Sequence, residues 1–221
     1  MVLNTITSLL PDLNKAFFET IYMVAISLFI AVLFGLPIGI ILFITGRNLM
    51  LENTLLHSVL GFIVNMVRSI PFIILMVALI PLTKLIASTT IGPAAASVSL
   101  SVAAIPFFAR LVETSLREID KGVIEAAVAV GASRWMIIKD VLIPEARPGI
   151  LQGLTITTIS LIGFSAMAGI IGGGGIGDLA IRFGYYRYDN TVMIVTVIIL
   201  ICLVQIIQLV GDKLSHLVDK R

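Results

Sequence analysis

The glycine-rich stretch at residues 172–177 comes nearest to a catalytic or cofactor-binding motif. Gly172, Gly174 and Gly177 satisfy the spacing G-x-G-x-x-G, which in dinucleotide-binding domains brings a helix N-terminus close to a pyrophosphate. That motif must follow a strand and precede a helix, whereas here it ends a long apolar segment. We therefore reject a dinucleotide site. The glycines are expected either to give flexibility near an outer gate or to allow close packing.

Residues for nucleotide, metal and covalent chemistry do not occur in the usual arrangements. No G-x-x-x-x-G-K-[ST] segment is present, so the chain lacks a phosphate-binding loop of that type. His57 and His216 are far apart, with no carboxylate or cysteine at a metal-ligand spacing, and the single Cys202 lies in an apolar run. We expect no metal and no cofactor in this chain.

Composition predicts an all-α integral membrane protein. Of the 221 residues, 58% are hydrophobic and only 13% are charged, and the net charge of +2 does not indicate nucleic-acid binding. Roughly 20 apolar residues suffice to cross about 30 Å of hydrocarbon as a helix. Five segments meet that requirement, at about residues 17–45, 57–83, 91–109, 149–177 and 191–210. We expect residues 1–221 to form a single transmembrane domain of five helices.

The lysines and arginines beside these spans predict the orientation of the chain, because cytoplasmic loops carry the positive excess. One side holds ten of them: Arg47, Arg110, Arg117, Lys121, Arg134, Lys139, Arg147, Lys213, Lys220 and Arg221. The other side holds four: Lys15, Lys84, Arg182 and Arg187. The N-terminus should therefore lie outside, and the C-terminus and the loop between spans three and four should lie in the cytoplasm.

That loop, residues 118–145, is predicted to form two helices joined at a glycine. Asp120 and Ser133 are residue types that cap helix N-termini, Gly131 is suited to a left-handed stop, and Pro144 should end the second helix. Small apolar residues recur at helical spacing in the first helix: Val123, Ala126, Ala127 and Val130. The pattern favours docking into a groove of a partner protein, and the alternative is a helix lying on the membrane surface.

The same segment resembles the EAA motif of binding-protein-dependent importer permeases. The matching positions are Glu125, Ala126, Ala127, Gly131, Ile143 and Pro144. The family pattern ends in I-x-L-P, and this chain departs from it only by Val141 and Ile143. The resemblance implies that segment 118–145 is a coupling helix-turn-helix that docks on a separate ATPase. It also implies that two ATPase copies bind ATP and Mg²⁺, and that this chain is a transport subunit rather than an enzyme.

Three further stretches are similar to methionine-import permeases, and the similarity runs from about residue 17 to the C-terminus. They are NMVRSIPFIIL at 65–75, IPFFARLVE at 105–113 and SAMAGIIGGGGIGDLA at 165–180. The resemblance implies methionine, in its L or D form, as the substrate. It also implies a bacterial cytoplasmic membrane and an extracytoplasmic binding protein or lipoprotein that delivers the substrate.

The alternatives are a permease of the same type for another small solute and, less favoured, an ion-coupled secondary transporter. The latter would carry ionisable residues in several spans and an internal repeat, whereas five spans do not divide evenly. Because five spans are too few to enclose a solute path, we expect a second copy of the chain, with the path on the two-fold axis.

Arg68, in the second span, is the ionisable residue that most needs a partner. With Ser69 beside it, Arg68 either contacts a substrate carboxylate in the pore or stabilises the bundle through a salt bridge or hydrogen bonds. Ser165 and Met167, near the middle of the fourth span, line the path or gate in one interpretation and pack between helices in the other.

Overall fold

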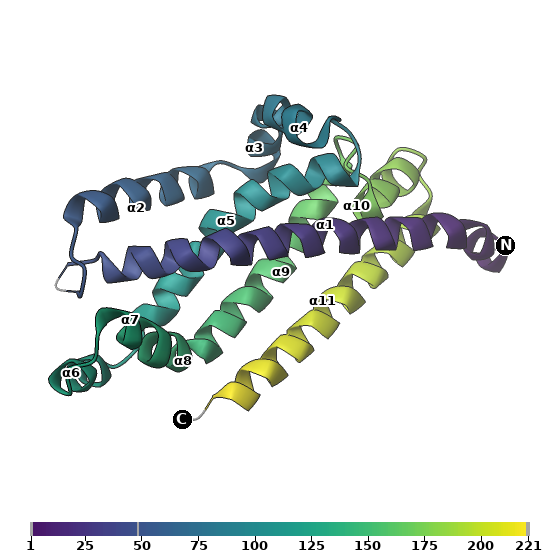
Figure 1. Ribbon diagram of the computed structural model, residues 1–221. Coiled ribbons are helices and arrows are strands. Elements are labelled where there is room, and N and C mark those ends of the chain that lie inside the picture. The colour runs from purple at the N-terminus through teal and green to yellow at the C-terminus, as the bar shows by residue number, and fades with distance from the viewer. Residues whose placement is uncertain (1, 48, 220–221) are drawn as a thin grey trace.

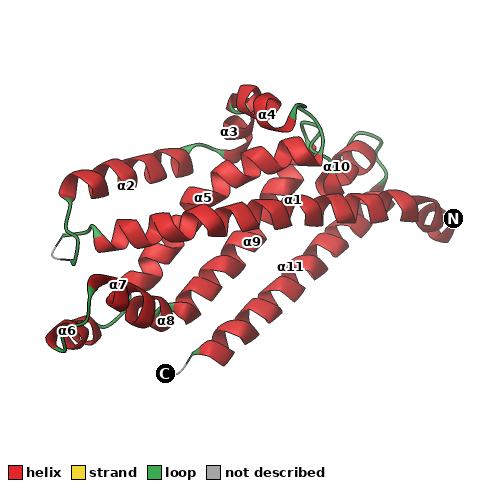
Figure 2. Cartoon of the chain, in the orientation of Figure 1, coloured by secondary structure: helices red, strands yellow, loops and turns green. Residues whose placement is uncertain are grey.

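The computed structural model describes residues 2–47 and 49–219, and these form helices and turns without a strand (Figure 2). The helices are α1 (Val2–Ile44), α2 (Thr54–Ser69), α3 (Phe72–Ala78), α4 (Ile80–Ala87), α5 (Pro93–Arg117), α6 (Lys121–Ala129), α7 (Arg134–Met136), α8 (Ile143–Glu145), α9 (Arg147–Gly169), α10 (Gly175–Leu179) and α11 (Asn190–Val218). Two π-helical segments, η1 (Ile137–Leu142) and η2 (Ala180–Tyr185), complete the set.

Four helical segments are long and apolar enough to cross a membrane: Leu9–Ile44 within α1, α5, α9 and α11. The pair α2 and α3 forms a fifth candidate crossing. The start of α1 and the end of α11 lie at opposite ends of the bundle (Figure 1), as an odd number of crossings requires. The all-α membrane architecture is therefore confirmed, with four candidate spans, or five if α2 and α3 together form one.

The second predicted span, 57–83, is not one continuous helix, and in this respect the prediction was wrong. α2 ends at Ser69, and α3 continues from Phe72 at an angle of 103°. Ile70 is extended, with φ −81° and ψ 126°, because the ring of Pro71 disfavours a helical conformation in the residue before it. Pro71 also lacks the N–H that would continue the helix.

Two other spans differ in their boundaries. The third was expected to end at residue 109, yet α5 continues to Arg117 because the charged residues of its last turns pair with one another within the helix. The fourth was expected to reach residue 177, yet α9 ends at Gly169. A turn with positive φ at Gly172 and Gly174 separates α9 from α10.

α5 is the central helix of the bundle, as its small residues predicted. It packs against α1, α2, α4 and α9 (Figure 1). Of the most apolar 18-residue stretch of α5, 61% is buried, compared with 11% for the corresponding stretch of α11. A Cβ atom at Gly39 of α1 would lie 2.5 Å from the Ala109 carbonyl oxygen and 2.7 Å from the Val112 Cβ. The backbones of α1 and α5 can therefore approach closely only because Gly39 has no side chain.

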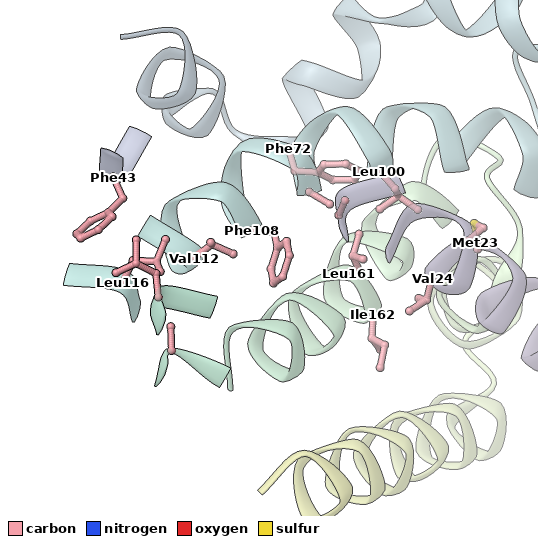
Figure 3. Packing of buried hydrophobic residues seen from close by; sticks show 14 of the residues in the cluster. Met23, Val24, Phe43, Phe72, Leu100, Phe108, Val112, Leu116, Leu161 and Ile162 are labelled. Carbon is pink, nitrogen blue, oxygen red and sulfur yellow. The ribbon is translucent and has the colours of Figure 1, made fainter. Parts of the chain in front are cut away.

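The apolar core lies where α1, α3, α5 and α9 meet (Figure 3). Its members include Met23, Val24, Phe72, Leu100, Phe108, Val112, Leu116, Leu161 and Ile162. Phe72 stacks on Phe164 with ring centroids 4.7 Å apart, which attaches the first turn of α3 to α9. α3 is thus fixed to the core immediately after the break that separates it from α2.

The glycine stretch forms a tight turn that is held by α1. The Glu19 carboxylate accepts the N–H of Gly175 at 2.8 Å, and the Thr20 hydroxyl accepts the N–H of Ile176 at 2.9 Å. A Cβ atom at Gly177 would collide with the backbone of Ala166. Of the two interpretations of these glycines, this geometry favours close packing.

Candidate coupling segment and translocation path

The predicted caps of the loop helices are present. The Asp120 side chain accepts the N–H of Gly122 at 2.6 Å at the start of α6, and Ser133 accepts the N–H of Met136 at 3.3 Å at the start of α7. Gly131 has φ +80°, with no atom within 4 Å of a Cβ built on it. Glycine is therefore required here by the left-handed backbone rather than by lack of space.

The second helix ends at Glu145, one residue after Pro144, where its end was predicted. The chain stays helical from α7 through η1 into α8, with Pro144 in the first turn of α8. Because Pro144 has no N–H, it donates no helical hydrogen bond to the preceding turn. The N–H of Ile143 reaches back to the Ile138 carbonyl, the wider spacing of a π-helix.

α6 stands out from the bundle beside α7 and α8 (Figure 1) and has no buried residue. Glu125 and Ala126 are exposed, whereas Ala127 packs against the edge of the core, so the predicted stripe of small residues is divided between two faces. Ile143 and Pro144 are half-buried. Exposed apolar side chains lie at the end of α6 and in the residues after it: Val128, Val130, Trp135 and Met136. An apolar surface outside the membrane-spanning helices is typical of a protein–protein contact.

Glu125 also lines a cavity of about 480 Å³ between the end of α1 and the start of α6. Its basic residues are Arg47, Arg117 and Lys121, and its apolar residues are Phe43, Leu49, Ile119 and Ile124. The carboxylate of Glu125 therefore faces a positively charged hollow on one side of α6.

Arg68 lies at the end of α2, next to the break. It is exposed and lines a cavity of about 190 Å³ together with Phe72, Phe107 and Phe164. The ion pairs formed among the described residues do not include Arg68. The Ser69 hydroxyl donates to the Asn65 carbonyl oxygen at 2.8 Å, within the same helix. Arg68 therefore lines a cavity beside the break, and Ser69 is exposed next to it without lining that cavity.

The two candidates in α9 occupy different environments. Ser165 is buried, and its hydroxyl donates to the Ile162 carbonyl oxygen at 2.8 Å. Met167 is 44% exposed and lies in the last turn of α9, shortly before the glycine turn. In this conformation Met167 is thus available to a second chain or a solute, whereas Ser165 is enclosed.

A charged group that the sequence analysis did not single out joins α2 to α5. The carboxylate of Glu113 is bound by Arg110 and Arg117, each at 2.6 Å, and Arg110 also donates to Asn65 at 2.8 Å. The signal in the sequence is the spacing of three and four residues, which places the three charged side chains on one side of a helix. Among the described residues, no group of three His, Cys, Asp or Glu side chains could hold a metal ion.

The apolar candidate spans and the exposed helix α6 are features of a membrane protein that docks on a partner. Residues 35–221 match the family described as binding-protein-dependent transport system inner membrane component, and the chain belongs to that family. It is therefore a membrane-embedded transport subunit.

The names of the similar proteins specify a substrate, which the family description does not. The chain is 53% identical over 209 residues to a probable D-methionine transport system permease protein, MetI, of Vibrio cholerae, covering 95% of this chain and 93% of the relative. It is 45% identical over 212 residues to the methionine import system permease protein MetP of Bacillus subtilis, covering 96% of both chains.

Solved structures agree with this assignment. The fold matches a chain of the MetNI methionine ABC transporter in an inward-facing conformation, with a TM-score of 0.94 and 43% identity over 96% of this chain and 99% of that chain. A chain from an amino acid ABC transporter has a TM-score of 0.79 at 19% identity, and this likeness concerns the fold alone.

Proposed function

We propose that this chain is the membrane-spanning permease subunit of an ATP-driven importer of methionine, in its L or D form. The observation that carries the proposal is the exposed helix α6, with Glu125 and Ala126 accessible and Gly131 in the left-handed conformation that ends it. Support for methionine comes from the names and high identity of the relatives.

The importer requires further subunits. Two copies of the permease form the core, because five spans cannot enclose a solute path, and the largely exposed α2 and α11 offer surface for that contact. Two ATPase subunits bind ATP and Mg²⁺, and each contacts segment 118–145 of one permease copy. A binding protein or lipoprotein delivers the solute from outside. Closure of the ATPases on ATP opens the path outward, and hydrolysis returns it to the inward-facing state.

The solute path passes the break between α2 and α3. Arg68 and Ser69 contact the polar groups of the solute, and Met167 narrows the path with a flexible apolar side chain. Ser165 is buried in the single chain and contributes to the path only if it becomes accessible during the transport cycle. What supports this arrangement is the exposure of Arg68, Ser69 and Met167 in the single chain, together with the cavity at Arg68.

The coupling role is tested by Glu125→Lys. Reversing this charge on the exposed face of α6 should reduce both co-purification of the permease with its ATPase and solute uptake at least tenfold, a loss expected when an interfacial charge is reversed. The control is Asp12→Lys, a charge reversal on an exposed residue of α1 that the predicted orientation places on the opposite side of the membrane. Unchanged association and uptake of the Glu125 variant would contradict the coupling assignment.

The substrate is tested by uptake into proteoliposomes that contain the purified permease–ATPase complex and the binding protein. Labelled methionine should accumulate only with ATP, and unlabelled L- or D-methionine should compete more strongly than other amino acids. If neither form competes, the methionine assignment is wrong and the importer assignment stands.

A further inference from the structure

Arg110, Glu113 and Arg117 form a charged row on α5, and the carboxylate of Glu113 is enclosed at its centre. The Glu113 side chain is 1% exposed, and both of its oxygens are occupied. Oε2 accepts from Arg110 Nη1 at 2.6 Å, whereas Oε1 accepts from Arg117 Nη2 at 2.6 Å and from its Nε at 3.1 Å. Charge-assisted hydrogen bonds of this kind are among the strongest in proteins, so the three side chains are expected to move together.

The two ends of this row lie beside different elements. Arg110 Nη2 donates to the Asn65 side-chain oxygen on α2 at 2.8 Å, one turn before Arg68. At the other end, Arg117 lines the cavity that Lys121 and Glu125 of α6 also line. The row is therefore bonded to the helix that precedes the break and borders the same cavity as the helix expected to dock on the ATPase.

α2 is attached to the bundle at few places. Val64 is its one buried residue. Near its start, His57 Nδ1 lies 2.9 Å from the Leu42 carbonyl oxygen of α1, and near its end Asn65 receives the bond from Arg110. Within the single chain, little apolar packing fixes this helix. Its polar contact with α5 then determines where its last turn lies.

We propose that Glu113 is a positioning residue for transport: through Arg117 and Arg110 it transmits movement of α6 to the last turn of α2, which carries the candidate path residues. An enclosed carboxylate is costly to leave unpaired, so displacement of Arg117 pulls on Glu113 and hence on Arg110 and Asn65. The inference rests on the coupling role proposed above for α6 and adds the route by which that role reaches the path.

The test measures solute imported per ATP hydrolysed, with the complete permease–ATPase complex and its binding protein in proteoliposomes. Glu113→Gln keeps the size of the side chain but removes its charge. It should leave ATP hydrolysis within about twofold of the unaltered complex and lower import per ATP about fivefold or more, the lower end of typical coupling effects. Glu113→Asp should recover part of the ratio. Thr114→Ala, at an exposed neighbour that bonds only to its own helix, should leave the ratio unchanged.

A second variant covers the case in which the Glu113 variants fail to assemble. Asn65→Ala alters an exposed side chain on α2 and should lower the same ratio. Adding Glu113→Gln should lower it little further, because both changes interrupt one chain of contacts. A wild-type ratio in Asn65→Ala, or in an assembled Glu113→Gln complex, would overturn the proposal. Failure of the proposed function is distinct, since the unaltered complex would then import no methionine or would not bind its ATPase.

Discussion

Arg68 is a cation in a membrane-spanning segment, and it is not among the ion pairs of the described residues. The salt bridge that the sequence left open as a role for Arg68 is therefore not formed within the described part of the chain. Glu113 presents the opposite case, because its two arginine partners enclose it completely. Of the two charged groups, Arg68 is the one available to a solute.

Replacing Arg68 by methionine tests this difference at the residue scale. The change removes a charge-assisted hydrogen bond to a carboxylate, worth about 1.5–3 kcal/mol, and should lower uptake at low substrate concentration by about tenfold or more. Arg68→Lys should retain part of the activity because it keeps the charge. The measurement is concentration-dependent uptake, with assembly of the complex checked by co-purification. Wild-type uptake by Arg68→Met would exclude Arg68 as a solute contact.

Among the elements, α1 and α5 form the contact on which the bundle depends, and Gly39 marks the point of closest approach. Gly39→Ala places a methyl group against the Ala109 carbonyl and Val112. The substitution should lower the free energy of unfolding by about 1–3 kcal/mol, the usual cost of overpacking a well-packed core. Thermal denaturation of the purified permease should show this loss of stability as a lower melting temperature. Gly163→Ala is the matched control, because a Cβ at Gly163 of α9 meets no atom within 4 Å. Equal melting temperatures for the two variants would contradict this account.

The break between α2 and α3 is the element that differs most from the expectation for a membrane span. Hydropathy alone predicts one helix over 57–83, because no charge other than Arg68 interrupts the apolar run. Pro71 is compatible with a kinked helix as well as with a break. The contact of Phe72 with Phe164 decides the outcome, because it directs α3 onto α9, at 103° to α2.

For the whole molecule, the testable property is its orientation in the membrane. In a Cys202→Ser background, Tyr186→Cys places a thiol in the loop between η2 and α11, and Leu217→Cys places one at the end of α11; both positions are exposed. If the N-terminus lies outside, a membrane-impermeant maleimide added to intact cells should label only the Tyr186 variant. Labelling of the Leu217 variant should require permeabilised cells. The reverse pattern would invert the predicted orientation.

The sequence by itself determined the class of fold, because the bilayer requires long apolar helices whatever their arrangement. It also determined the segment most specific to the family. The Asp120 and Ser133 caps and the left-handed Gly131 follow from local backbone chemistry, and the structure has all three. The second helix ends one residue after Pro144, but local rules did not foresee the π-helical segment within it.

Only the tertiary structure decided which polar residues have partners. Arg68 and Glu113 are both charged residues within or beside apolar spans; the sequence singled out Arg68 but left its role open, and it did not reveal the pairing of Glu113. Glu113 is enclosed because α5 lies at the centre of the bundle, and Arg68 is open because α2 is packed through one buried residue. The physical reason is that burial and pairing depend on how helices distant in sequence pack together, which hydropathy and residue spacing do not specify.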